Sequence, residues 1–305
     1  MDNPKELTHI SLCAGYGGID VGLKRVLPNL RTVAFSEIEA YAVANLVAKM
    51  EAGLLDAAPI WTNLKTFPWK DFRGKVDILS GGFPCQPFSA AGRRKGDEDP
   101  RHLFPYIKQG IQLLRPAIVF LENVEGIISS KLGEGWTDTE GTPVLLHVLR
   151  ELERVDYKAT AGIFSASEVG APHQRKRVFI MAHSNNTQPP AGSIDFIHKI
   201  GRSMEGTWNA ISKEWSARSD VIISNCDVWP SRRGEDQREW EPKRTIKSSL
   251  GGDADGSSDW MDYGDLCESV CNRTDELRLL GNGVVPSTAE RAFRVLWEKI
   301  KKAPN

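Results

Sequence analysis

One cysteine of this chain stands in a setting suited to nucleophilic chemistry. Cys85 lies between Pro84 and Gln86, shortly after an apolar run that ends at Leu79. Such a run predicts a parallel strand, and open α/β sheets bind their ligands at the carboxyl ends of their strands. An isolated cysteine is usually a buried apolar side chain without chemistry. The flanking prolines would hold the Cys85 thiol rigidly at this edge, where it could attack a substrate, and the motifs elsewhere in the chain decide between the two interpretations.

A carboxylate and two arginines are candidates for the same sheet edge. Glu122 ends an apolar run, so a strand there would project its carboxylate to the rim that carries Cys85. Without Cys85, Glu122 is better explained as a strand-end carboxylate bonded to local amides. Arg175 and Arg177 alternate ahead of another apolar run, so we expect both side chains to point to one face. A carboxyl group in a dry pocket has a raised pKa, which suits a general acid.

A glycine-rich turn after the first apolar run predicts a nucleoside cofactor site. Gly15, Gly17 and Gly18 let backbone N–H groups approach a ligand closely, beside the start of a helix. Glu37 ends the second apolar run, about 20 residues on, where an acid suits ribose hydroxyls. An oxidoreductase with a nucleotide cofactor is disfavoured, because the turn is Gly-x-Gly-Gly and no third glycine follows at the Rossmann offset.

Strands that alternate with helices predict an α/β fold, a doubly wound, mostly parallel sheet with helices on both faces. The predicted strands are residues 10–13, 32–35, 76–79, 117–121 and 178–182. The predicted helices are residues 40–51, 104–114 and 144–152. A last amphipathic helix over 292–300 follows the capping-box pattern Ser287-x-x-Glu290 and is expected to pack back on the sheet.

The composition changes at residue 184. Residues 184–271 are rich in Asn, Ser, Gly, Asp and Arg and hold five of the nine tryptophans. A disordered linker would be poor in aromatic residues. We therefore expect a small irregular domain over 184–271, inserted into a core domain made of residues 1–183 and 272–305.

The chain as a whole has the composition of a soluble globular protein. It has 305 residues, 40% hydrophobic and 26% charged, with a formal net charge of −1. No window approaches the ~20 apolar residues of a membrane span, and the first nine residues lack the apolar region of a signal peptide. Five cysteines without regular spacing indicate a reducing compartment. We expect a cytoplasmic monomer that enters no membrane.

Taken together, the motifs resemble those of the DNA (cytosine-5) methyltransferases. Five occur in the order of that family: the glycine turn, Pro-Cys, Glu-Asn-Val at 122–124, the paired arginines, and Gly281-Asn282. The similarity covers residues 7–183 and 272–302. Ser11 and Cys13 stand where the family has Asp and Phe.

The resemblance implies methylation of cytosine C5 in a specific double-stranded DNA sequence, with S-adenosyl-L-methionine as the methyl donor. Cys85 would attack C6 of a base flipped out of the duplex, while Glu122 engages N3. Arg177 would contact the base O2, and Arg175 would support it or bind phosphate. No metal is expected. The implied cofactor-binding residues are Leu12, Cys13, Gly15, Tyr16, Gly17, Gly18, Glu37, Ile38, Asn63, Pro84 and Asn282.

DNA contacts are expected from two parts of the chain. The loop after Ser89 resembles the one that closes over DNA in the family, and residues 184–271 stand where the family has its target-recognition domain, which reads the major groove. Each basic cluster, taken alone, is better explained as a solvated surface. The candidate DNA contacts are Gln86, Ser89, Arg93, Arg94, Lys95, Arg232, Arg233, Lys243 and Arg244.

Other functions stay open at this point. An RNA cytosine-5 methyltransferase of the same fold is disfavoured by the sizeable insert, and a decayed DNA-binding module by the retention of the candidate catalytic residues. A zinc site of Cys226, Cys267 and Cys271 is the weaker alternative, because the spacing is loose and no histidine completes it. The resemblance also leaves room for a partner restriction endonuclease that acts on the same site, and for a nucleoid-associated or phage-encoded protein.

Overall fold

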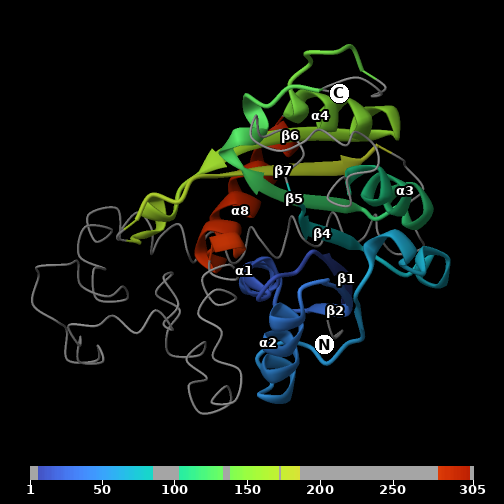
Figure 1. Cartoon of the computed structure of the whole chain (residues 1–305), viewed down its shortest axis with the longest axis vertical. Helices are drawn as coiled ribbons and strands as arrows, with labels where there is room; N and C mark the ends of the chain where they lie inside the picture. Colours follow the sequence, from blue (N-terminus) through green and yellow to red (C-terminus); the bar gives the residue numbers. More distant parts are fainter. Residues whose placement is uncertain (1–5, 85–102, 133–137, 172, 186–280, 303–305) are drawn as a thin grey trace, which may run out of the picture.

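The computed structural model describes residues 6–84, 103–132, 138–171, 173–185 and 281–302 (Figure 1). A seven-stranded sheet in the order β3-β2-β1-β4-β5-β7-β6 forms its centre. Neighbouring strands are parallel from β3 to β5, and β7 runs antiparallel to both β5 and β6. The predicted mostly parallel sheet is therefore confirmed. The strands are β1 (Leu7–Leu12), β2 (Leu30–Ser36), β3 (Ile60–Trp61), β4 (Ile78–Gly82), β5 (Ile118–Val124), β6 (Tyr157–Phe164) and β7 (Arg177–Ser184).

Helices cover both faces of the sheet, as expected for a doubly wound fold (Figure 1). Successive strand residues alternate between the two faces, so Leu79 and Val119 pack with helices α3 and α4, whereas Ile78 and Phe120 pack with α1 and α8. Both faces are apolar, which explains the continuous hydrophobic runs in the sequence. The helices are α1 (Gly18–Val26), α2 (Ala40–Glu51), α3 (Phe104–Leu114), α4 (Val144–Arg154) and α8 (Pro286–Lys302).

Helix α8 lies against α1, although more than 250 residues separate them in the sequence (Figure 1). The contact depends on a glycine, because a Cβ atom at Gly22 would stand 2.5 Å from the carbonyl oxygen of Pro286. Residues 281–302 thus share a hydrophobic core with the N-terminal strands. The proposed boundaries of the inserted domain, 184 and 271, lie at or beyond the edge of the described residues.

Three features of the fold differ from the predictions. Strands β3 and β6 were not expected, and β6 escapes notice because its sequence is broken by Lys158, Thr160 and Gly162. The capping-box prediction was wrong: α8 begins at Pro286, so Ser287 lies inside the first turn, and its hydroxyl accepts a hydrogen bond from Arg25.

Among the described helices, none combines the length and apolar character needed to cross a bilayer.

Candidate functional site

The carboxyl ends of β1, β4 and β5 meet at one edge of the sheet, where the candidate acid lies. Gly82 at the end of β4 is paired with Glu122 on β5. A Cβ atom at Gly82 would stand 3.1 Å from Oε2 of Glu122 and 3.7 Å from the carbonyl oxygen of Cys13. Because Gly82 has no side chain, the Glu122 carboxylate has room between the glycine turn that follows β1 and the start of the Pro-Cys loop.

Glu122 is buried and paired with an arginine. Its side chain is 6% exposed, and Oε1 lies 2.9 Å from Nε of Arg177, the first residue of the neighbouring strand β7. Burial raises the pKa of Glu122 to about 7, although the charges of Arg177 and Arg175 act to lower it. The carboxyl group is therefore poised to carry or release a proton near neutral pH, as a general acid requires.

The second arginine, Arg175, lies near the same region, but its backbone differs from the predicted strand-like alternation. Arg175 lies outside β7 and has a left-handed backbone, with φ of 35°, so the two arginines do not alternate along a strand. Nη2 of Arg175 donates to the carbonyl oxygens of Gly283 (2.6 Å) and Gly281 (3.2 Å), and Nη2 of Arg177 donates to that of Gly281 (3.3 Å). Both arginines therefore bind residues 281–285, which we call the returning segment.

The start of the Pro-Cys loop is held by a residue that the sequence reasoning did not single out. Nδ2 of Asn123, which is 2% exposed, donates to the carbonyl oxygen of Phe83 at 2.9 Å. The Phe83 ring is buried against Phe104 of α3, whereas Pro84 is exposed. Asn123 follows the candidate acid directly, and its place in Glu-Asn-Val is the signal that identifies it. Cys85 itself lies outside the described residues.

The cofactor turn, residues 13–18, has an unusual backbone. Cys13, Gly15 and Gly17 all have positive φ values, of 48°, 56° and 83°. A Cβ atom at Gly15 would meet no atom within 4 Å, so the turn is open on that side, and Gly17 precedes the first residue of α1. Backbone N–H groups at an open helix start favour a negatively charged or polar ligand group.

Glu37 binds the cofactor turn from the end of β2. Its Oε2 accepts the N–H of Gly15 at 2.8 Å, and its Oε1 accepts the N–H groups of Ile38 and Glu39 at 2.9 and 3.0 Å. A carboxylate offers about four acceptor positions, so about one is left for a ligand hydroxyl. Next to it, Ile38 is 72% exposed and Trp61 is 42% exposed.

These residues fit S-adenosyl-L-methionine: a buried acceptor for a ribose hydroxyl, exposed apolar side chains for a purine, and an open glycine turn. Trp61 was missed by the sequence reasoning, because a strand of two residues has no periodicity to reveal it. It lies beside Glu37, whose N–H donates to its carbonyl oxygen.

The other predicted cofactor residues lie around this turn in different ways. The side chains of Leu12 and Tyr16 are buried, whereas Asn63 and Asn282 are exposed. Oδ1 of Asn63 accepts the N–H of Lys65 and so caps a short helical turn, Leu64–Thr66. Burial and the Glu37 charge raise the pKa of the Cys13 thiol to about 12, which keeps the thiol protonated.

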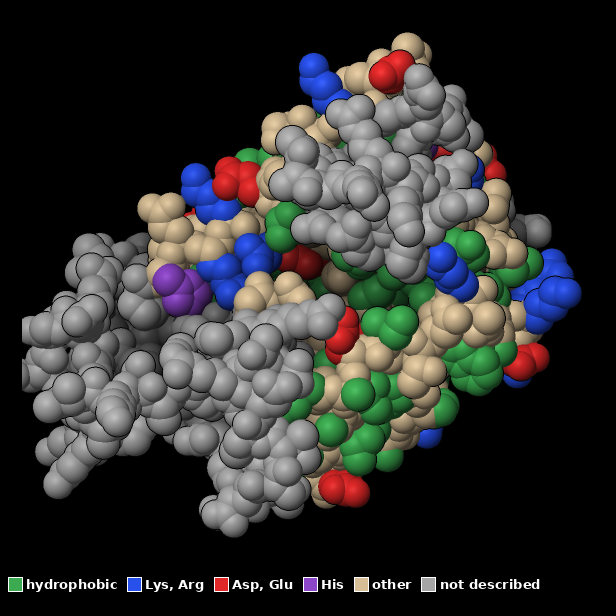
Figure 2. Space-filling model, viewed as in Figure 1, with side chains coloured by type: hydrophobic (Ala, Val, Ile, Leu, Met, Phe, Trp, Pro, Cys, Tyr) green, Lys and Arg blue, Asp and Glu red, His purple; other side chains and the backbone are tan. Residues whose placement is uncertain are grey.

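Basic side chains gather beside a hollow on the face of the molecule seen in Figure 2, and an acidic side chain lies recessed there. The predicted DNA contacts cannot be compared with this surface, because they lie outside the described residues. The same holds for the three cysteines considered as zinc ligands. Those DNA contacts are Gln86, Ser89, Arg93, Arg94, Lys95, Arg232, Arg233, Lys243 and Arg244.

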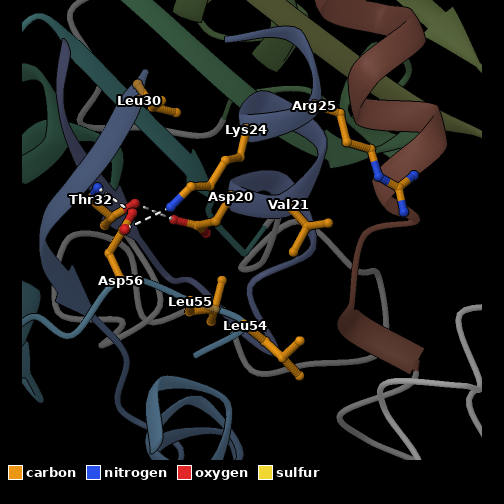
Figure 3. A pocket seen from close by; sticks show the side chains of 9 residues that line it. All are labelled: Asp20, Val21, Lys24, Arg25, Leu30, Thr32, Leu54, Leu55 and Asp56. Atoms are coloured by element: carbon orange, nitrogen blue, oxygen red, sulfur yellow. Dashed lines mark hydrogen bonds and ion pairs between the residues drawn. The ribbon is translucent and has the colours of Figure 1, made fainter. Parts of the chain in front are cut away.

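A separate pocket of about 240 Å³ lies between α1, β2 and residues 54–56 (Figure 3). None of the predicted site residues lines it. Asp20 on its wall accepts hydrogen bonds from Ser11 (2.8 Å) and Thr32 (3.2 Å), and burial raises the pKa of Asp20 to about 6. Asp20 of α1 thus brings a carboxylate next to Ser11, the position at which the resemblance leads us to expect an aspartate.

Comparisons with known proteins identify the family of the chain. The model of the C-5 cytosine-specific DNA methylase family matches residues 7–249. The Type II methyltransferase M.NlaX of Neisseria lactamica is 32% identical over 178 residues, 58% of this chain and 52% of that protein. The Type II methyltransferase M.NaeI of Lentzea aerocolonigenes is 26% identical over 342 residues, 99% and 76% of the two chains.

Among solved structures, a DNMT2 variant from Spodoptera frugiperda is similar to 60% of this chain and 51% of its own, with 24% identity and a TM-score of 0.47. The chain spans about half the length of several of the curated relatives that it matches. Because the family model matches most of the sequence, the chain belongs to the C-5 cytosine-specific DNA methylase family.

Proposed function

We propose that this protein methylates C5 of cytosine in a specific double-stranded DNA sequence, with S-adenosyl-L-methionine as the methyl donor. The observation that carries the proposal is the buried Glu122 carboxyl, paired with Arg177 and adjacent to the end of the strand that leads into the Pro-Cys loop. A carboxyl with a pKa near 7 at this position is suited to protonate a ring nitrogen.

The reaction begins with attack of the Cys85 thiolate on C6 of the target base. As the Sγ–C6 bond forms, N3 takes a proton from Glu122, and the C4–C5 bond becomes an enamine with electron density at C5. The bound cofactor supplies an activated methyl group for C5. Loss of the C5 proton to a base then expels the Cys85 thiolate. N3 returns its proton to the Glu122 carboxylate, and the aromatic ring is restored.

Other side chains hold the reacting groups in place. Arg177 fixes the Glu122 carboxyl and would donate to the base O2, while Arg175 holds the returning segment. Asn123 fixes the backbone two residues before Cys85. Because the target carbon lies inside a duplex, the base must first leave the stack.

Sequencing of bisulfite-treated DNA from cells that express the protein tests this function. Protected cytosines should appear within one short sequence context and should be absent from cells that carry the empty vector. Methylation confined to RNA, or none in either nucleic acid, would contradict the proposal.

Loss of the Glu37 carboxylate should weaken cofactor binding. Glu37→Ala removes a charge-assisted acceptor for the ribose and also releases the N–H of Gly15, so the Kd for S-adenosyl-L-methionine should rise about 10- to 100-fold. Calorimetry measures this change, and DNA affinity should stay nearly constant. The control is Glu51→Ala, which removes the same charge from an exposed position on α2. An unchanged Kd for the Glu37 variant would remove Glu37 from the cofactor site.

We also propose that residues 184–271 form the target-recognition domain and choose the sequence without taking part in the chemistry. Exchange of this segment for that of a relative with a different specificity should move the methylated site, as bisulfite sequencing reads it. Arginines that read bases should each contribute about 1–3 kcal/mol of discrimination at one position. A well-folded chimera that keeps the original site would place specificity in the core domain.

The proposal also includes that the protein is a cytoplasmic monomer. Its partner would be a restriction endonuclease that recognises the same DNA sequence. The relatives named Type II methyltransferases support this partner class. Cleavage of unmethylated but not of methylated DNA by an extract of the source cells would reveal such an endonuclease.

A further inference from the structure

We propose that Tyr16 is a positioning residue, whose hydroxyl fastens the cofactor turn to the returning segment and through it to the two arginines. The inference rests on the proposed function, because it assumes that the cofactor turn binds S-adenosyl-L-methionine. It concerns the side chain of Tyr16, which is buried and so is not available to touch a ligand.

Tyr16 makes contacts on both sides of the turn. Its hydroxyl donates to the carbonyl oxygen of Val284 at 2.6 Å, across 268 residues of sequence. Nζ of Lys49 donates to the Tyr16 carbonyl oxygen at 2.7 Å and lies 4.9 Å from the centre of the Tyr16 ring. Lys49 itself is fully buried, so α2 fixes the backbone of Tyr16 while the side chain reaches the returning segment.

The fit between these two segments depends on glycines. A Cβ atom at Gly283 would stand 1.7 Å from Cε1 of Tyr16, and one at Gly18 would stand 1.9 Å from the Val284 carbonyl oxygen. Both distances are far below a normal contact, so no other residue type fits without a shift of the backbone. The ring and the returning segment therefore have one close-packed arrangement.

The two arginines also bind the returning segment. Arg175 holds the carbonyl oxygen of Gly283, and Tyr16 holds that of the next residue, Val284. Arg177 binds the carbonyl oxygen of Gly281 and also pairs with Glu122. A continuous set of contacts thus runs from the cofactor turn to the candidate acid.

Tyr157 offers a matched control for the Tyr16 hydroxyl. It is fully buried, its hydroxyl donates to the carbonyl oxygen of Pro116 at 2.6 Å, and the Arg115 guanidinium lies 5.3 Å from its ring centre. It is the first residue of β6 and pairs with Ser184 at the end of β7, beside the amino end of β5, whereas Glu122 lies near the carboxyl end of β5. Tyr16→Phe and Tyr157→Phe therefore remove the same group from similar surroundings, and only one removal affects the site.

The experiment compares both variants with the wild-type protein. Tyr16→Phe should raise the Kd for S-adenosyl-L-methionine about fivefold, the equivalent of one buried hydrogen bond, and lower kcat. Without cofactor, hydrogen exchange at the amides of residues 283–290 should be faster than in the wild type. Both variants should lower Tm by a similar amount. Tyr157→Phe, however, should leave the Kd, kcat and the exchange of these amides unchanged.

A double-mutant cycle tests the connection to the arginines. The double variant Tyr16→Phe/Arg175→Lys should lose less in log kcat than the two single variants lose together, because both residues act on the returning segment. Strictly additive losses would overturn the connection. If Tyr16→Phe does not fold, Lys49→Met, which frees the Tyr16 carbonyl, should give the same rise in Kd.

Two failures can be told apart. If the wild-type protein binds no S-adenosyl-L-methionine, the proposed function fails, and the exchange comparison alone decides whether Tyr16 positions the returning segment. If the wild type binds the cofactor and the Tyr16 and Tyr157 variants bind it equally well, the proposed function stands and this inference is wrong.

Discussion

Cys85→Ser should abolish methyl transfer, with a loss in kcat of at least about 10³-fold, while the protein still binds S-adenosyl-L-methionine. A serine hydroxyl is scarcely ionised near neutral pH, so it cannot form the covalent bond to C6 that makes C5 reactive. Incorporation of tritiated methyl groups and calorimetric cofactor affinity, measured in parallel, separate chemistry from binding. Substantial residual transfer would remove Cys85 from the nucleophile role.

A mechanism-based substrate sharpens this test. In duplex DNA with 5-fluorocytosine at the target position, the fluorine blocks the final loss of the C5 proton, so the wild-type protein should be trapped as a covalent adduct on a denaturing gel. Cys85→Ser should form none. Cys267→Ser is the matched control: it should keep transfer and adduct formation, and its loss of both would revive the zinc alternative.

The parts of the fold that the sequence predicted are those with a strong local signal. The apolar run 117–121 overlaps β5 from residue 118 on; β5 is buried on both faces, and a short run of that kind is typical of a central strand. Strand β6 lacks such a run, because it is the outermost strand of the sheet and only its first and last residues are buried. The contacts that α4 and α8 make with it are tertiary, and the composition of the strand does not reveal them.

In the site, local motifs predicted which residues matter, but not how they are held. Glu37 was expected from its place at a strand end, yet its bond to Gly15 joins positions 22 residues apart. The contact of Arg175 with Gly283 spans 108 residues and depends on a left-handed backbone at the arginine. Such contacts form only when elements distant in the sequence pack together, as α8 does against α1, and the sequence offers no pattern for them.

Glu122→Gln should lower kcat about 10²- to 10⁴-fold, the range of a lost general acid. Burial raises the pKa of Glu122 to about 7, so the carboxyl is protonated below that pH and loses its proton above it. The wild-type kcat/KM, which reports ionisation of the free enzyme, should therefore fall as the pH rises through about 7. Glutamine keeps the shape of the side chain but does not titrate, so the residual activity of the variant should lack this alkaline limb.

The same pKa predicts a change in stability. Because the folded pKa of Glu122 lies above its ordinary value of 4.5, its contribution to stability is complete below about 4.5 and is lost as the pH rises through about 7. Glu122→Gln removes this dependence, so the drop in Tm between pH 5 and pH 8 should be smaller in the variant than in the wild type.

Glu125→Gln is the control for both measurements, since it makes the same substitution at an exposed position three residues along the chain. It should keep the wild-type kcat, the alkaline limb and the fall in Tm. An alkaline limb that persists in Glu122→Gln would assign the titration to another group. If the Tm of Glu122→Gln also showed the wild-type dependence on pH, Glu122 would be ionised throughout this range in the wild type. Its part in the reaction would then be that of a fixed negative charge beside Arg177 rather than that of a proton donor.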